Sequence, residues 1–445
     1  MTQEINIDLE LNIASDAVVL ADVSTGYIFL EKNADARVYP ASTTKIMTAL
    51  IAIDYAEGRD GGYEERVVFS DNAVFGIEPG SSNIAMDTGE SLSLRQALFA
   101  MMVASANEVA MAIAEHIGGS VEGFADMMNE RAASVGCGGT HFVNPHGLDD
   151  PEHYTTARDM AAIMREAVRR PFFRELVAAE RFDVPPTEKQ KETRRLINSN
   201  KMIQQGSEFF RSYIIGGKTG YTDLARHSLV SLAELDGGSE FAGSDSRGFR
   251  RESTANSPAV ICAVMSGGKN QPYTDTAALC EYGFGEYAPR SVSPAGGFST
   301  VWLLGENGSV RLTLEQADAV MAVLPKAMPD AAVEFDPILP ESVAESPSVG
   351  DVAGIVELRV NGSVVGSSPL VVISSETATE EPSAASEPAA YSTDPSPSNV
   401  NSPEEPQGGV SPYAAAGIGM VVAAGAYAAF RLSAGAAKRR GRRKQ

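Results

Sequence analysis

Apolar and polar positions follow two different periods along the first two thirds of the chain. Helical spacing recurs in residues 44–56, 92–117, 121–134 and 156–179, and again in "DTAALCEYGFGEYA". Strand-like segments occur toward both ends of this region: "AVVLADVSTGYIFLEKN", with a turn at Thr25-Gly26, and then "SYIIGGKTGYT", "HSLVSLAEL" and "AVICAVM". Because strands flank a block of helices, we predict an α/β (α+β) domain over residues 1–287 whose terminal segments share one sheet.

A two-residue alternation continues beyond that domain. The stretches "STVWLLGENGSVRLTL" and "GDVAGIVELRVNGSVVGSSPLVVI" each place a turn between two alternating runs, which predicts two β-hairpins. We therefore assign residues 288–373 to a small all-β domain. The polar stretch 236–257, which separates two strands of the first domain, is expected to be a surface loop.

The periodic patterns end after residue 373. Residues 374–412 consist largely of Ser, Pro, Glu and Ala without any Lys, Arg or His, which predicts a disordered acidic linker. Residues 413–432 are largely apolar and precede a basic tail at 433–445. This order favours a single transmembrane helix with a cytoplasmic C-terminus and the catalytic domain outside the cell, although a buried or interfacial helix is an alternative. An outside location requires an export signal, which we expect upstream of Met1 because the first residues do not resemble one.

Charge and cysteine content exclude several functional classes. The chain has 58 acidic against 36 basic residues, which argues against nucleic-acid binding. Its three cysteines, Cys137, Cys262 and Cys280, are too few for a disulfide framework and lack metal-binding spacing. We expect neither a metal nor another cofactor.

The first candidate catalytic residues lie in "PASTTKIMTAL", where Ser42 stands at a predicted helix start and Lys45 follows three residues later. Residues at this spacing share one helical face, so the hydroxyl and the amine form a nucleophile with a candidate base. The alternative is a capped core helix whose lysine extends to water. The pair is not unique, because Ser266 and Lys269 repeat the spacing.

Two further motifs favour the chemical interpretation. Ser105-Ala106-Asn107 lies between predicted helices, and Lys218-Thr219-Gly220 lies on a predicted strand. An S-x-N sequence also occurs at residues 81–83, whereas Lys-Thr-Gly occurs once. The ordered set S-x-x-K, S-x-N and K-T-G, with each member in a suitable element, is far more specific than any one motif.

With this set the chain resembles the serine-type D-alanyl-D-alanine carboxypeptidases, the low-molecular-mass penicillin-binding proteins. The resemblance covers about residues 12–373 and includes "GGTHFVNPHGLDD", "HYTTARDMA" and "INSNKM". It implies a penicillin-binding/serine β-lactamase-like catalytic domain with a sheet and a helical subdomain. It also implies removal of the terminal D-Ala from peptidoglycan stem pentapeptides through an acyl-serine intermediate, with β-lactams as covalent inhibitors.

Roles for individual residues follow from the resemblance and from elementary chemistry. Ser42 is the expected nucleophile, and Lys45 can act as its base only with a pKa lowered by burial and by the charge of Lys218. Ser105 is expected to relay a proton to the leaving amine, and Asn107 to hold Lys45 and the substrate amide. The expected substrate-binding residues are Lys218 and Thr219 for the terminal carboxylate, Gly220 for the peptide backbone, and Tyr221, whose N–H would complete an oxyanion hole with that of Ser42.

Three positions depart from the family pattern. Glu108 follows Asn107 where Asp is common, Arg226 stands where Gly is usual, and Pro272 or Tyr273 falls where many members have Arg. The missing Arg keeps open a membrane-tethered module that binds penicillin or wall peptide with little turnover. A serine β-lactamase is a further alternative, because those enzymes have the same motif set. His146 and His153 are interpreted as structural.

Overall fold

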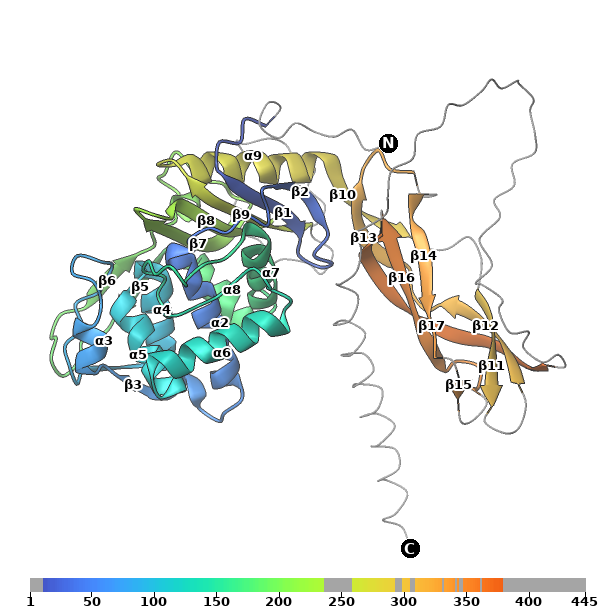
Figure 1. Cartoon of the computed structure of the whole chain (residues 1–445), viewed down its shortest axis with the longest axis horizontal. Coiled ribbons are helices and arrows are strands. Elements are labelled where there is room, and N and C mark those ends of the chain that lie inside the picture. Colours follow the sequence, from blue (N-terminus) through green and yellow to red (C-terminus); the bar gives the residue numbers. More distant parts are fainter. Residues whose placement is uncertain are drawn as a thin grey trace, which may run out of the picture.

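A five-stranded antiparallel sheet forms the centre of the first domain, with strand order β2-β1-β9-β8-β7. The computed structural model describes residues 11–235, 258–292, 298–304, 309–329, 332–340, 342–343, 347–360 and 362–378 (Figure 1). The strands of this sheet are β1 (Ala17–Asp22), β2 (Ile28–Lys32), β7 (Ile214–Thr222), β8 (Arg226–Glu234) and β9 (Ala259–Gly267). Since β1 pairs with β9, the prediction that the two ends of the region share one sheet is confirmed.

Side chains alternate between the two faces of this sheet, and both faces are buried. Val19 and Ile261 pack against a large helical block, whereas Val18 and Cys262 pack against α9 (Gln271–Glu286) on the other face. Figure 1 shows α9 alone on its side of the sheet and the other helices on the opposite side. This two-sided burial explains why the strands are continuously apolar rather than alternating with polar residues.

The helical block contains the remaining helices: α2 (Lys45–Glu57), α3 (Asp71–Phe75), α4 (Leu94–Ala104), α5 (Asn107–Gly118), α6 (Val121–Ser134), α7 (Ala157–Ala167) and α8 (Pro171–Ala178). Short turns and strands connect them: η1 (Ala41–Thr44), η2 (Gly62–Glu64), η3 (Lys201–Ile203), β3 (Arg66–Val68), β4 (Ser91–Ser93), β5 (Arg181–Val184) and β6 (Arg194–Ile197).

Two predicted helices are each two helices in the structure. The predicted helix over 92–117 ends at Ser105, which adopts a left-handed conformation with φ 58°, and α5 begins two residues later. The predicted helix over 156–179 is divided before Pro171, which occupies the first turn of α8. Hydrophobic periodicity continues across both breaks because both helices of each pair pack on the same core, so the pattern could not show them.

The second unit contains only strands among its described residues: β10 (Tyr287–Val292), β11 (Phe298–Leu304), β12 (Ser309–Gln316), β13 (Val320–Pro325), β14 (Glu334–Ile338), β15 (Ser342–Val343), β16 (Val352–Val360) and β17 (Ser363–Ala378). Antiparallel pairing of β11 with β12, and of β16 with β17, confirms both predicted hairpins. One prediction is wrong here. Residues 374–378 belong to β17 and pair with β12, so they are not part of a linker.

The two units meet where α9 continues directly into β10. The Tyr287 ring lies 4.1 Å from that of Phe29, between ring centroids, and Lys326 Nζ donates a hydrogen bond to the Gly285 carbonyl oxygen. No helix in the described part of the chain is long and apolar enough to cross a membrane. The predicted membrane span at 413–432, the basic tail and the loop at 236–257 lie outside the described residues.

Candidate active site

Ser42 lies in η1, immediately before α2, and it is not a helix cap. Thr44 is the N-cap residue of α2, and no side chain caps the helix. The Ser42 hydroxyl instead lies 2.9 Å from Lys45 Nζ. The preceding residue, Ala41, has a φ of +47°, which is unusual for a residue with a side chain. Ala41 therefore begins a tight turn that directs Ser42 toward Lys45.

Lys45 is fully buried, and three oxygen atoms surround its amine. Its Nζ lies 2.9 Å from Ser42 Oγ, 2.7 Å from Asn107 Oδ1 and 2.7 Å from the carbonyl oxygen of His146. A carbonyl oxygen can only accept a hydrogen bond, so Asn107 and His146 take two amine hydrogens. A neutral amine has just two hydrogens, and its lone pair then faces the Ser42 hydroxyl.

Burial is the main reason why the pKa of Lys45 lies well below its ordinary value, and the positive charge of Lys218 lowers it further. The negative charge of Glu108 acts in the opposite direction. These are the two causes that the sequence predicted for a free amine at this position. The side chain can therefore accept a proton from Ser42 at a pH where an exposed lysine is already protonated.

A second serine–lysine pair faces the first. Lys218 Nζ donates hydrogen bonds to Ser105 Oγ and to the Thr219 carbonyl oxygen, both at 2.9 Å. Burial lowers the pKa of Lys218 to about 7. Ser105 is placed for this contact by the left-handed turn that ends α4. The structure thus brings together the S-x-x-K, S-x-N and K-T-G motifs from η1, the α4–α5 corner and β7.

The K-T-G strand lies unusually close to the Ser42 turn. A Cβ atom on Gly220 would lie 3.0 Å from the Pro40 carbonyl oxygen and 3.2 Å from Ala41 Cβ, so a larger residue would push β7 away. Strand β7 is at one end of the sheet order, and its outer edge is free of strand partners among the described residues. A peptide could therefore pair with it as an added strand.

The side chain of Tyr221 contacts residues outside the three motifs. The side chain is exposed, its hydroxyl donates to Asp223 Oδ1 at 2.8 Å, and its ring stacks on His227 at 4.3 Å. The role predicted for Tyr221 requires only its backbone N–H. Thr219 Oγ1 lies 2.5 Å from Ser199 Oγ, a partner that the sequence analysis did not single out.

The loop around His146 and His153 positions the site, and its carbonyl contact with Lys45 was not foreseen. His153 Nδ1 accepts a hydrogen bond from the Val143 N–H, so Nε2 must bear the proton and donate to Thr44 Oγ1 at 2.9 Å. Burial lowers the pKa of both histidines to about 3, which keeps them neutral. The stretches that contain them, "FVNPHGLDD" and "HYTTARDMA", offered a signal only through family resemblance.

The three departures from the family pattern have structural counterparts. Arg226 has a φ of +58°, a conformation that favours glycine, and pairs with Asp16 at 2.8 Å. Glu108 is buried beside Asn107. The Tyr273 hydroxyl donates to the Ser199 carbonyl oxygen at 3.1 Å, and the Lys201 ammonium lies over the Tyr273 ring at 5.9 Å.

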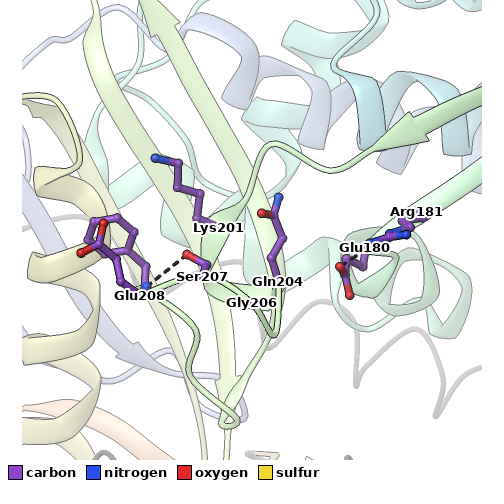
Figure 2. Close-up of a pocket in the computed structure, with 8 residues that line it drawn as sticks. Glu180, Arg181, Lys201, Gln204, Gly206, Ser207 and Glu208 are labelled. Atoms are coloured by element: carbon purple, nitrogen blue, oxygen red, sulfur yellow. Dashed lines mark hydrogen bonds and ion pairs between the residues drawn. The ribbon is translucent and has the colours of Figure 1, made fainter.

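Lys201 also lines a pocket of about 440 Å³ (Figure 2). It is lined by Glu180, Arg181, Lys201, Gln204, Gly206, Ser207, Glu208 and Phe209. None of the predicted catalytic residues lines it, so it is separate from the Ser42 centre. The two sites are linked through the chain, because Lys201 follows Ser199 by two residues and Ser199 contacts Thr219.

Comparison with known proteins identifies the family. The family model described as D-alanyl-D-alanine carboxypeptidase, Peptidase_S11, matches residues 3–240. The chain belongs to this family. It is 31% identical over 225 residues to the D-alanyl-D-alanine carboxypeptidase DacF of Bacillus subtilis and 26% identical over 379 residues to DacA of Escherichia coli. These alignments cover 51% and 81% of this chain, and 55% and 83% of the two relatives. The chain thus spans about half the length of the Bacillus relative.

Solved structures of family members show the same fold. Penicillin-binding protein 5 from Haemophilus influenzae superimposes with a TM-score of 0.62 at 25% identity, covering 81% of this chain and 97% of that one. A second structure, PBP3 from Streptococcus pneumoniae, has a TM-score of 0.63 at 21% identity over 82% of this chain and 99% of that one, which shows the fold alone. The predicted penicillin-binding-protein-like α/β fold is confirmed.

Proposed function

We propose that this protein is a serine-type D-alanyl-D-alanine carboxypeptidase that releases the terminal D-Ala from peptidoglycan stem peptides, and that β-lactams acylate the same serine. The observation that supports this most strongly is the buried Lys45 amine, held between Ser42 Oγ, Asn107 Oδ1 and the His146 carbonyl oxygen. Burial of a lysine costs free energy of folding, and ionisable groups perturbed in this way are concentrated at functional sites.

In the first step, Ser42 Oγ attacks the carbonyl carbon of the penultimate D-Ala while its proton passes to Lys45 Nζ. The new oxyanion is stabilised by the backbone N–H groups of Ser42 and Tyr221. The amide C–N bond then breaks, and the proton that Lys45 took from Ser42 passes to the leaving amine through the Ser105 hydroxyl, which Lys218 contacts. Lys45 is then neutral again. The products of this step are D-Ala and an ester on Ser42.

In the second step, water attacks the ester carbonyl and gives a proton to Lys45. The C–O bond breaks, Lys45 returns this proton to Ser42 Oγ, and the shortened peptide leaves as a carboxylic acid that loses its remaining proton to solvent water. Both steps use one base, because the neutral Lys45 amine is restored when the leaving group of each step has taken its proton.

Substrate binding uses β7. The peptide extends along the outer edge of the strand, next to Gly220, where the lack of a side chain lets β7 lie close to the turn that carries Ser42. The terminal carboxylate is attracted by the Lys218 charge and by the Thr219 hydroxyl. A peptide that ends in a free carboxylate is therefore preferred over an amide.

The experiment that tests this function is incubation with diacetyl-Lys-D-Ala-D-Ala. We expect release of one D-Ala per peptide, with no release by Ser42→Ala. Two other results would replace the proposal: covalent penicillin binding without D-Ala release would favour a binding module, and rapid turnover of nitrocefin without D-Ala release would favour a β-lactamase.

We further propose that the chain is anchored in the cell membrane by residues 413–432, with the catalytic domain outside and the C-terminus in the cytoplasm. The basic residues that follow this apolar segment support this orientation, since cytoplasmic flanks are rich in Lys and Arg. Protease added to wall-stripped intact cells should remove the catalytic domain and leave the tail protected. Resistance until lysis would contradict the anchoring or the export.

A further inference from the structure

Glu108 is a buried acid for which the reaction described above has no use. It is the second residue of α5, directly after Asn107, and only 2% of its surface is exposed. Its Oε1 accepts a hydrogen bond from the Ile84 N–H at 2.6 Å. Within the described part of the chain, no lysine or arginine forms an ion pair with it. Burial raises the pKa of this carboxyl, and nearby backbone N–H groups, that of Ile84 first, partly offset the effect.

The hydrogen bond to Ile84 fixes the start of α5 against a neighbouring turn. The Asn107 N–H donates to the Ser82 carbonyl oxygen at 2.8 Å, so two successive residues of α5 hold the same turn. Ala85, the next residue of that turn, has a φ of +55°. These two bonds determine where Asn107 begins α5 and hence where its side chain meets Lys45.

The charges around the Lys45 amine come from several elements. Lys218 on β7 contributes a positive charge, and Glu108 on α5 contributes a negative one. His146 in the 144–148 loop and His153, which contacts Thr44, are both neutral because burial lowers their pKa values to about 3. Glu108 is thus the acid whose charge opposes burial and Lys218 at this amine.

We propose that Glu108 is a positioning residue that acts on Lys45 in two ways: its charge offsets that of Lys218, and its hydrogen bond to Ile84 holds Asn107 against the amine. The proposal rests on the proposed function, in which Lys45 is the base for Ser42. An amine with a very low pKa is unprotonated but accepts a proton poorly. The negative charge of Glu108 therefore improves the balance between the fraction of Lys45 that is neutral and the basicity of its amine.

The test measures the second-order rate of acylation by a fluorescent penicillin as a function of pH. Glu108→Gln removes the charge but keeps an oxygen that can accept from Ile84. Without the negative charge the pKa of Lys45 falls, so the acidic limb of the profile should move to lower pH. The plateau should fall roughly three- to tenfold, because the amine is a weaker base. The two profiles should therefore cross, with the variant faster at the acidic end.

The matched control is Glu115→Gln. It removes a carboxylate from the same helix, about 10 Å further along at 1.5 Å per residue, where Glu115 contacts Ser70 and Asn72 instead. This control should reproduce the wild-type profile. A Glu108→Gln profile that is lower at every pH but not shifted would show a merely structural role and overturn the charge assignment.

A second variant, Glu108→Asp, separates charge from position and covers the case in which Glu108→Gln does not fold. Asp keeps the charge but is too short to reach Ile84, so the limb should stay in place while the plateau falls. A shifted limb or an unchanged plateau would contradict the proposal. Failure of wild-type protein to be acylated at all would instead contradict the proposed function.

Discussion

Two segments of this chain have the same four-residue spacing of Ser and Lys, yet their structures differ completely. Ser42 and Lys45 lie at the start of α2, where the lysine is fully buried and its amine is 2.9 Å from the serine hydroxyl. Ser266 is near the end of β9 with a φ of +59°, its N–H donates to Ser228 Oγ, and Lys269 is exposed in the turn before α9.

The difference shows that the S-x-x-K motif can form a nucleophile and its base only in a particular structural setting. On a helix start, residues three apart lie on one face and their side chains meet. A strand end followed by a turn does not bring them together in this way. A lysine in water is protonated at neutral pH, so burial of the kind found around Lys45 is also needed to produce a free amine.

Replacement of the two serines should give the largest contrast. Ser42→Ala removes the nucleophile, so we expect complete loss of covalent penicillin labelling on a denaturing gel. Ser266→Ala should label like the wild type. Labelling of Ser42→Ala, or its loss in Ser266→Ala, would mean that the two segments have been assigned the wrong way round.

Replacement of the two lysines tests the base. Lys45→Met should slow acylation by roughly 10²- to 10⁴-fold, the usual contribution of a general base. Lys269→Met should leave the rate unchanged, since the side chain is exposed in the turn before α9. Stopped-flow or gel-based acylation rates measure both. A Lys45→Met rate within a few fold of wild type would rule out Lys45 as the base.

Substitution of a glycine close to each segment should give a smaller difference in acylation rate and stability. Gly147 has a φ of +90°, and a Cβ there would lie 1.8 Å from the Ala41 carbonyl oxygen, whereas Gly268 has open space around it. Gly147→Ala must shift the turn that presents Ser42, so we expect slower acylation and a lower melting temperature. Gly268→Ala should change neither quantity. Equal behaviour of the two variants would contradict the close fit at Ser42.

Burial of Lys218 should also make the stability of the fold depend on pH. The pKa of Lys218 is about 7 in the folded chain and about 10.4 in an unfolded one. The unfolded state therefore binds more protons between these values, and stability should rise with pH across that window. The free energy of unfolding of the wild type, relative to Lys218→Met, should increase by at most about 5 kcal/mol. A free-energy difference that does not change with pH would contradict the burial account.

Much of the fold and of the chemistry was accessible from sequence, for identifiable reasons. Helix α6 matches its predicted range, 121–134, because one amphipathic face packs on the core and a Ser N-cap precedes it. The lowered pKa of Lys45 followed from placing a lysine in an apolar helix beside a second cationic motif.

Other features depend on tertiary contacts that no local pattern records. The His146 carbonyl oxygen reaches Lys45 from 101 residues away, and Ser199 meets Thr219 across two elements. The break at Ser105 requires a backbone conformation that apolar spacing does not encode. Strand β17 extends to Ala378 through pairing with β12, although the residues at its end have the composition of a linker.

The most direct test of the central claim is to locate the acyl group itself. The full chain is incubated with benzylpenicillin, digested, and analysed by tandem mass spectrometry. We expect a single penicilloyl adduct on Ser42, in the peptide that contains "PASTTK", and none on Ser266 or Ser105. An adduct on another serine, or none at a penicillin concentration that saturates labelling of a known family member, would contradict the account.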